Sequence, residues 1–323
     1  MKKFTSVKDV SDIDQLVKEA IALKKKPFQF QKLGQNKTLG LIFLNPSLRT
    51  RLSSQKAASN LGMNTIVMNI DKEGWALETK EGVVMNGKTV EHIKDAARVM
   101  GQYFDVLGIR SFPSLINRDE DYSEDILNKF TKYSGIPVIS LESATLHPLQ
   151  SLADLITIKE NLPAGRQGWK SVKKPKVVLT WAPHVKALPQ AVANSFSEWM
   201  CKADVDLTIT HPDGYELSKQ FTKGASVTHE QDKALAGADF VFVKNWSAYE
   251  DYGKILSDGK GWMLTNKKMA LTNNGKVMHC LPVRRGVELS DELIDGKNSL
   301  IIEQASNRVY SAQVVLKNIL ESL

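Results

Sequence analysis

The sequence predicts an α/β protein with two doubly wound parallel-sheet domains and a C-terminal helix that packs back on the first domain. Short apolar runs alternate with longer amphipathic segments, the pattern of parallel strands joined by crossover helices. The alternation pauses at a turn-rich stretch, 161–168, and then restarts. The length of 323 residues also suits two domains. We expect them at 1–150, together with 304–323, and at 151–303.

Each element follows from its local pattern. The first strand is the apolar run Leu-Gly-Leu-Ile-Phe-Leu, which is typical of a buried strand. In the first half, we expect strands at 39–44, 65–70, 105–109 and 137–139, and helices at 49–61, 91–103 and 123–133. The stretch 71–89 is polar and has no periodicity. In the second half, we expect strands at 176–181, 205–209, 240–243 and 276–279, and helices at 188–202 and 304–323.

Composition excludes several classes of protein. Hydrophobic residues make up 42% and charged residues 24%, so the chain is not disordered. No apolar run approaches the roughly 18 residues of a membrane span. Residues 1–5 are followed by charged residues rather than by the apolar run of a signal peptide, so no signal peptide is expected. Two cysteines, Cys201 and Cys280, do not suggest a disulfide-stapled protein, and we expect a cytoplasmic one.

The net charge of +7 favours an anionic ligand. A nucleic-acid-binding protein usually concentrates basic residues in a stripe with stacking aromatic residues. The basic clusters here, 24–26 and 173–176, are short and suit solvated loops or helix ends. A small anionic substrate is therefore favoured over nucleic acid.

One sequence match conflicts with its context. Residues 82–89 fit the P-loop pattern G-x-x-x-x-G-K-T. A P-loop leaves a buried strand directly, but the preceding expected strand ends near Ile70. A P-loop nucleotide-binding enzyme is therefore the alternative, and a flexible loop with two turn glycines is the simpler interpretation.

The strongest chemical signal follows the first strand. Residues 45–51 read Asn-Pro-Ser-Leu-Arg-Thr-Arg, at a junction of strand and helix where open amide groups and the helix dipole favour anions. Ser47 and Thr50 add hydroxyl donors, and Arg49 and Arg51 add guanidinium groups suited to phosphate. The simpler alternative is a helix cap with surface arginines.

Further polar residues follow other expected strands. Arg110 follows the strand ending at Ile109, and 147–150 opens another helix after the strand near Ile139. The sequence His-Cys-Leu-Pro at 279–282 follows the strand ending at Met278. Ligands of open α/β sheets bind at the carboxyl ends of strands. Each residue alone has an ordinary structural explanation, but together they predict one site.

These motifs resemble those of the aspartate and ornithine carbamoyltransferases. Residues 47–51 resemble the family's S-x-R-T-R motif, 147–150 its H-P-x-Q motif, and 279–282 the H-C-L-P motif of the ornithine branch. Asn307-Arg308 resembles the N-R pair of the last helix. The motifs span residues 47 to 308 in the family's order. The resemblance makes the P-loop match a coincidence.

The resemblance implies carbamoyl transfer from carbamoyl phosphate to an amine, without a metal or another cofactor. It implies catalytic roles for Thr50, Arg110 and His147, which would polarise the carbonyl oxygen. The carbamoyl phosphate site implied by the resemblance comprises Ser47, Leu48, Arg49, Thr50, Arg110, His147, Gln150, Cys280, Leu281 and Arg308.

The acceptor side differs from that of the ornithine enzymes. Their loop D-x-x-x-S-M-G holds a free α-amino group, but no S-M-G occurs here, and 242–246 reads Phe-Val-Lys-Asn-Trp. Lys244 would repel an α-amine and suits an acylated one. The chain thus resembles the N-acylornithine carbamoyltransferase branch. The resemblance implies acceptor contacts from Trp75, Val90, Glu142, His184, Lys244 and Arg284.

Trp75 and Val90 lie in a segment that resembles a loop reaching into a neighbouring subunit's site, which implies a homotrimer. At the position of Val90, acetyl-specific members of the branch have Glu and succinyl-specific members have Pro. Glu would repel a succinyl carboxylate and Val would not, so we expect N-succinylornithine, with N-acetylornithine as the alternative. The simpler interpretation of Val90 is an ordinary loop residue.

Overall fold

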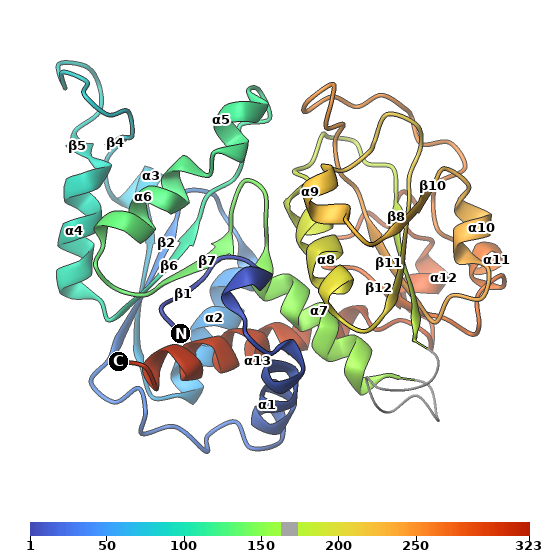
Figure 1. Cartoon of the computed structure of the whole chain (residues 1–323), viewed down its shortest axis with the longest axis horizontal. Helices are drawn as coiled ribbons and strands as arrows, with labels where there is room; N and C mark the ends of the chain where they lie inside the picture. The colour runs from blue at the N-terminus through green and yellow to red at the C-terminus, as the bar shows by residue number, and fades with distance from the viewer. Residues whose placement is uncertain (163–173) are drawn as a thin grey trace.

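The structure is a computed structural model that describes residues 1–162 and 174–323. Each half contains a five-stranded sheet in which all paired strands are parallel (Figure 1). The first sheet has the order β1-β7-β6-β2-β3, with β1 Lys3–Phe4, β2 Thr38–Phe43, β3 Asn64–Asn69, β6 Val106–Arg110 and β7 Val138–Glu142. The second has the order β10-β9-β8-β11-β12, with β8 Lys176–Trp181, β9 Asp206–Thr210, β10 Ser226–Thr228, β11 Phe240–Lys244 and β12 Lys276–Met278.

Helices connect these strands and cover the faces of both sheets. The longer helices are α1 Ile13–Lys25, α2 Leu48–Asn60, α4 Ile93–Tyr103, α6 Asp125–Tyr133, α7 Pro148–Glu160, α8 Ala191–Lys202 and α13 Ile301–Leu320. Shorter ones are η1 Val7–Asp9, α3 Ile70–Glu73, α5 Arg118–Tyr122, α9 Lys219–Thr222, α10 Gln231–Leu235, α11 Asn266–Met269 and α12 Asp291–Ile294. None of the helices in the described ranges is both long and apolar enough to span a bilayer.

Alternation along β2 gives the first sheet two buried faces. Leu39, Leu41 and Phe43 belong to a core shared with α1, α2, α7 and α13. Ile42 belongs to a separate core shared with α4 and α6. Successive side chains of a strand point to opposite faces, so a strand buried on both faces must be apolar throughout. The doubly wound fold follows from that pattern.

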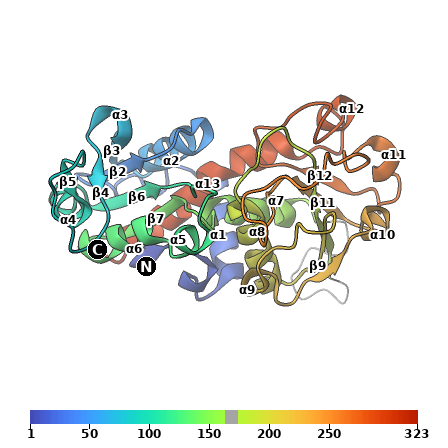
Figure 2. The same cartoon turned by 90° about the horizontal axis from the view of Figure 1, so that it is seen from above.

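Two helices join the halves of the molecule. α7 is buried from Pro148 to Ile158, and α13 packs against both α7 and α2. Figure 2 shows α13 alongside the first sheet and extending toward the second. The core that contains Leu41 also contains Leu179 and Phe242 of the second sheet, and residues of α13. The expected return of the C-terminal helix to the first half is therefore confirmed, although the helix begins at Ile301 rather than at 304.

The sequence-based elements agree with the structure apart from their ends and some omissions. The strand expected at 137–139 continues to Glu142, and the helix expected at 123–133 corresponds to α6, with the short helix α5 before it. α1 and the two-residue β1 were not predicted. Most of the turn-rich stretch expected at 161–168 lies outside the described residues.

The stretch 71–89 has more structure than its sequence predicted. It includes part of α3, and β4 Leu77–Glu78 pairs with β5 Glu91–His92. The indole Nε1 of Trp75 donates to Glu91 at 2.8 Å, and the Val90 amide donates to the carbonyl of Ala76 at 3.0 Å. These bonds hold Trp75 and Val90 close to each other on a surface segment.

Candidate active site

A cleft of about 860 Å³ lies at the carboxyl ends of both sheets. The residues that line it come from the start of α2, the ends of β6, β7 and β11, the start of α7, the segment after β12, and α13. The four sequence motifs therefore meet in one place. The lining includes Ser47, Leu48, Arg49, Thr50, Arg110, Glu142, His147, Gln150, His184, Lys244, Cys280, Leu281, Arg284 and Arg308.

The start of α2 places the first motif in the cleft. Ser47 is the N-cap, and its Oγ accepts a hydrogen bond from the amide of Thr50 at 3.3 Å. This bond satisfies one of the amides that a helix start leaves open. Thr50 is buried, whereas Leu48 is largely exposed. The segment that caps α2 is therefore also a segment that lines the cleft.

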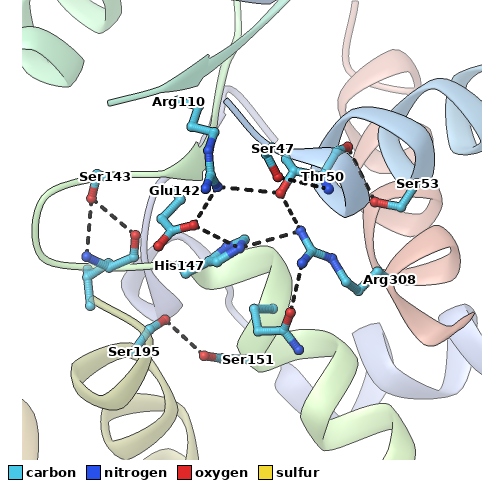
Figure 3. A network of polar contacts seen from close by, with 12 residues as sticks. Ser47, Thr50, Ser53, Arg110, Glu142, Ser143, His147, Ser151, Ser195 and Arg308 are labelled. Atoms are coloured by element: carbon cyan, nitrogen blue, oxygen red, sulfur yellow. Dashed lines mark hydrogen bonds and ion pairs between the residues drawn. The ribbon is translucent and has the colours of Figure 1, made fainter. Parts of the chain in front are cut away.

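Arg308 connects α13 with α2 and α7 in a network of polar contacts (Figure 3). Its guanidinium donates to Thr50 Oγ1 at 2.6 Å and to Gln150 Oε1 at 3.0 Å, and it lies 3.4 Å from His147 Nε2. α13 thus presents one planar group to α2 and α7 together. This geometry suits a guanidinium, which has several donors in a fixed plane.

Arg110 and Glu142 form the opposite side of this network (Figure 3). The Arg110 guanidinium pairs with the Glu142 carboxylate and lies 3.5 Å from Thr50 Oγ1. The same carboxylate lies 3.5 Å from His147 Nε2. Because all these groups are buried, their positions are fixed before a ligand arrives.

The cleft has a strongly positive lining. Among its described lining residues, Glu142 is the one acidic side chain, against Arg49, Arg51, Arg110, Lys244, Arg284 and Arg308. Burial, and then the neighbouring Arg110, lowers the pKa of Arg308 to about 10, so the guanidinium remains charged at neutral pH. Burial likewise lowers the pKa of Arg49. Several cations with one carboxylate provide the electrostatics of an anion site.

Two other titratable groups in the cleft are neutral at pH 7. Burial, followed by the charges of Arg308, Arg110 and Arg49, holds the pKa of His147 well below its usual value. Burial raises the pKa of the Cys280 thiol to about 11. His147 is therefore a neutral imidazole whose Nδ1 has no protein partner, and Cys280 is a thiol rather than a thiolate.

The second half of the chain forms one wall of the cleft, and this wall carries cationic side chains of its own. Lys244 ends β11, and Arg284 Nε lies 3.0 Å from His184 Nε2. Behind them, the His279 ring lies between Glu288, at 3.3 Å, and the amide of Leu281, at 2.9 Å. These bonds fix the segment that carries Cys280 and Leu281 against the cleft.

Two features bear on the expected site residues, and one of them, the surroundings of Arg51, differs from the sequence analysis. Trp75 and Val90 do not line the cleft of their own chain, and their side chains are 53% and 64% exposed. Arg51 borders the cleft, but its guanidinium donates to Asn69 Oδ1 at 2.8 Å and lies over the Phe43 ring. It is therefore engaged by the protein, whereas Arg49 is not paired in this way.

The P-loop alternative is wrong. The stretch 82–88 is exposed, and a Cβ on Gly82 or Gly87 would meet no atom within 4 Å. β5 separates this stretch from α4, so the loop does not lead directly from a buried strand into a helix as a phosphate-binding loop does.

The sequence analysis missed two buried residues that support the site. Asp154 Oδ1 accepts from Gln150 Nε2 at 2.7 Å and from Gln304 Nε2 at 2.6 Å. Gln304 Oε1 in turn accepts from the amide of His279 at 2.8 Å. The spacing of Asp154 four residues after Gln150 puts both on one helix face, which was the available signal.

Comparisons with known proteins agree with this geometry. The family model for the aspartate/ornithine carbamoyltransferase carbamoyl-P binding domain matches residues 2–160, and that for the Asp/Orn binding domain matches 189–319. The chain is 52% identical to N-succinylornithine carbamoyltransferase of Bacteroides thetaiotaomicron, with 100% of both chains covered. It is 35% identical to N-acetylornithine carbamoyltransferase of Xanthomonas axonopodis pv. citri, with 98% and 96% covered.

Solved structures are also similar. Acetylornithine transcarbamylase complexed with acetylcitrulline matches with a TM-score of 0.91 and 34% identity, covering 99% of each chain. A glutamate-to-valine variant of N-acetyl-L-ornithine transcarbamylase, complexed with carbamyl phosphate and N-succinyl-L-norvaline, matches with the same TM-score and identity over 99% of this chain and 100% of that one. Full-length similarity, a shared fold and the four motifs in one cleft agree, and the chain belongs to the aspartate/ornithine carbamoyltransferase family of enzymes.

Proposed function

We propose that this enzyme transfers the carbamoyl group of carbamoyl phosphate to the side-chain amine of N-succinyl-L-ornithine, giving N-succinyl-L-citrulline and phosphate. The observation that carries this proposal is the arrangement of the cleft. A cluster of buried cations and hydroxyl groups lies at one end, and Lys244, His184 and Arg284 lie at the other. The first end suits a phosphate and the second suits the carboxylates of an acylated amino acid.

At the phosphate end, Ser47, Arg49, Thr50 and Arg110 bind the dianion. Arg308 is already held by Thr50 and Gln150, so it contributes a charge without a large rearrangement. Leu48 lies at the same helix start and is a further contact of carbamoyl phosphate. Gln150 and the backbone carbonyls of Cys280 and Leu281 hold the carbamoyl NH2 group.

The reaction forms a bond from the acceptor nitrogen to the carbamoyl carbon and breaks the bond from that carbon to the phosphate oxygen. Negative charge develops on the carbonyl oxygen as the amine attacks. Thr50, Arg110 and a neutral His147 donate to that oxygen and stabilise the charge. The leaving phosphate accepts the amine proton, and the cleft holds both reactants in line.

At the acceptor end, Lys244, His184 and Arg284 bind the carboxylates of the acceptor. Glu142, which also lines the cleft, is a further contact of the acceptor. We place Trp75 and Val90 at this end of the cleft of a neighbouring subunit in a homotrimer. Both side chains are exposed, and neither lines the cleft of its own chain. We place Val90 at the position of the glutamate that is replaced by valine in the solved variant with N-succinyl-L-norvaline. An apolar side chain there accepts a succinyl group without charge repulsion.

We also propose that the two domains bind mainly different substrates. Residues 1–150 and 304–323 supply most of the carbamoyl phosphate site, to which Cys280 and Leu281 add contacts from the second half. Residues 151–303 supply the cations of the acceptor end, to which the first half adds Glu142, Trp75 and Val90. We propose that the reaction belongs to arginine biosynthesis, which the names of the relatives support. Both cysteines are free, as suits a reducing cytoplasm.

Product formation from carbamoyl phosphate with ornithine, N-acetylornithine and N-succinylornithine, side by side, tests the proposal. We expect the highest kcat/KM with N-succinylornithine and little turnover of ornithine, whose α-amine Lys244 repels. Faster turnover of N-acetylornithine would establish the alternative acceptor. Turnover of ornithine alone would refute the assignment of the acceptor end.

A further inference from the structure

Two histidines lie side by side at the carboxyl edge of the second sheet, outside the cleft already described. His211 directly follows β9, and His229 directly follows β10. β9 and β10 are parallel neighbours in which Thr210 pairs with Thr228, so the next residue of each strand emerges at the same level. The two rings are 5.0 Å apart and nearly perpendicular.

Hydrogen bonds orient both rings. His211 Nδ1 lies 2.8 Å from the carbonyl oxygen of Pro212, and His229 Nδ1 lies 3.1 Å from that of His211 and 3.4 Å from Asp213 Oδ1. These acceptors keep a hydrogen on each Nδ1 and leave the Nε2 lone pair available. Histidines that bind metals usually donate their other ring nitrogen to a carbonyl or carboxylate in this way.

A carboxylate completes the cluster. Glu216 Oε1 lies 3.9 Å from His229 Nε2, and one ligand atom from each of His211, Glu216 and His229 lies within 4.8 Å of the other two. His211 is 1% exposed, whereas Glu216 and His229 are exposed. The cluster is therefore anchored on its inner side and open to solvent on its outer side.

We propose that His211, Glu216 and His229 form a binding site for a zinc ion. Imidazole nitrogens and a carboxylate oxygen are ligands that zinc prefers, and three protein ligands leave one tetrahedral position for water. Neighbouring ligand atoms in such a site are about 3.3 Å apart, because the bonds are about 2.0 Å long. The exposed side chains of Glu216 and His229 move inward to bind the ion, while His211 stays in place.

The site is separate from the cleft. None of the three residues is among those that line the cleft. The His211 ring packs on Trp246, whose Nε1 donates to the carbonyl of Tyr215 at 2.8 Å. An ion bound here links the ends of β9 and β10 to the segment 211–216 and stabilises this edge of the second half. The inference is independent of the proposed reaction.

Equilibrium dialysis of the chelator-treated, full-length enzyme against micromolar zinc tests the site, with bound metal measured by mass spectrometry. We expect one zinc ion per chain. His229→Ala and Glu216→Gln alter exposed side chains, so the variants should fold, and each should weaken zinc binding by about tenfold or more. Glu230→Gln is the matched control, because Glu230 is an exposed neighbour whose carboxylate pairs with Lys233 at 2.5 Å.

A second measurement separates this site from adventitious zinc binding in the cleft. Zinc should raise the Tm of the parent enzyme and of Glu230→Gln by several degrees, and that of His229→Ala by much less, since a ligand stabilises only the state that binds it. Saturating carbamoyl phosphate should leave the zinc stoichiometry unchanged. The absence of bound zinc, or equal zinc affinity in the parent and both ligand variants, would overturn the proposal.

Discussion

Arg49 and Arg51 lie two residues apart on α2 and have different surroundings. The Arg49 guanidinium borders the cleft, and its buried Nε has no protein partner. Arg51 is held by Asn69. We therefore expect Arg49→Ala to weaken carbamoyl phosphate binding by about 1.5–3 kcal/mol, as for the loss of a charged hydrogen bond, and Arg51→Ala to weaken it far less. Calorimetry on both variants measures this difference, and an unchanged affinity in Arg49→Ala would contradict the motif assignment.

The role that we expect for Val90 depends on its side chain being uncharged. Val90→Glu places a carboxylate where we expect the succinyl carboxylate to bind. Like charges about 4 Å apart repel by about 4 kcal/mol at an effective dielectric constant of 20, and half of that energy lowers the rate about thirtyfold. Turnover of N-acetylornithine and the affinity for carbamoyl phosphate should change little.

Val84→Glu is the matched control for that experiment, because Val84 is exposed in the same segment. Parallel kinetics with both acceptors separate the outcomes. Equal losses with the two acceptors, or no loss with either, would mean that Val90 is an ordinary loop residue.

At the scale of elements, α7 contains a buried carboxyl group that titrates near neutral pH. Burial raises the pKa of Asp154 to about 7, although its bonds from Gln150 and Gln304 oppose the rise. An aspartate in the unfolded chain has a pKa of about 3.9. Between about pH 4 and pH 7, Asp154 is therefore protonated in the folded chain and ionised in the unfolded chain. The free energy of unfolding falls as the pH rises through this range.

Asp154→Asn removes this titration and keeps an oxygen that both glutamine amides can reach. The variant should lose less free energy of unfolding than the parent between about pH 4 and pH 7. Chemical denaturation at several pH values measures the two slopes. Parallel slopes would show that Asp154 is ionised in the folded protein throughout this range.

Much of the fold was predictable because its strands are continuous apolar runs at regular spacing. α1 was missed although Asp12 caps it and Leu16, Val17 and Ala20 form a buried stripe, so the signal was present. β1 has two residues and exists through its pairing with β7, which no local pattern reveals.

The site was predictable to the extent that its residues follow strands. The carboxyl ends of parallel strands meet at one edge, which brought Thr50, Arg110 and His147 together as expected. The bonds of Asp154 to Gln304 and the approach of His211 to His229 depend on helix packing and strand register. Neither can be read from a single segment.

At the scale of the whole molecule, we expect a homotrimer whose sites are shared between subunits. Sedimentation at micromolar concentration should give the mass of three chains. Mixing inactive Trp75→Ala and Arg308→Ala subunits, after dissociation and reassembly, should restore part of the activity, because some sites then receive an intact Trp75 and an intact Arg308. Trp75→Ala or Arg308→Ala refolded alone should stay inactive. A fully active monomer, or mixtures without restored activity, would contradict shared sites.

Arg308 contacts Thr50 across 258 residues of sequence, and this separation has a consequence for synthesis of the enzyme. Domains generally fold as units while the chain emerges, with the N-terminal one first. The first half departs from that order, because its core includes residues of α13, so its packing is complete only after Arg308 has been added to the chain. A nascent or prematurely terminated polypeptide presents an incomplete pocket, so it should not sequester carbamoyl phosphate, and only chains translated past Arg308 compete for this metabolite in the cell.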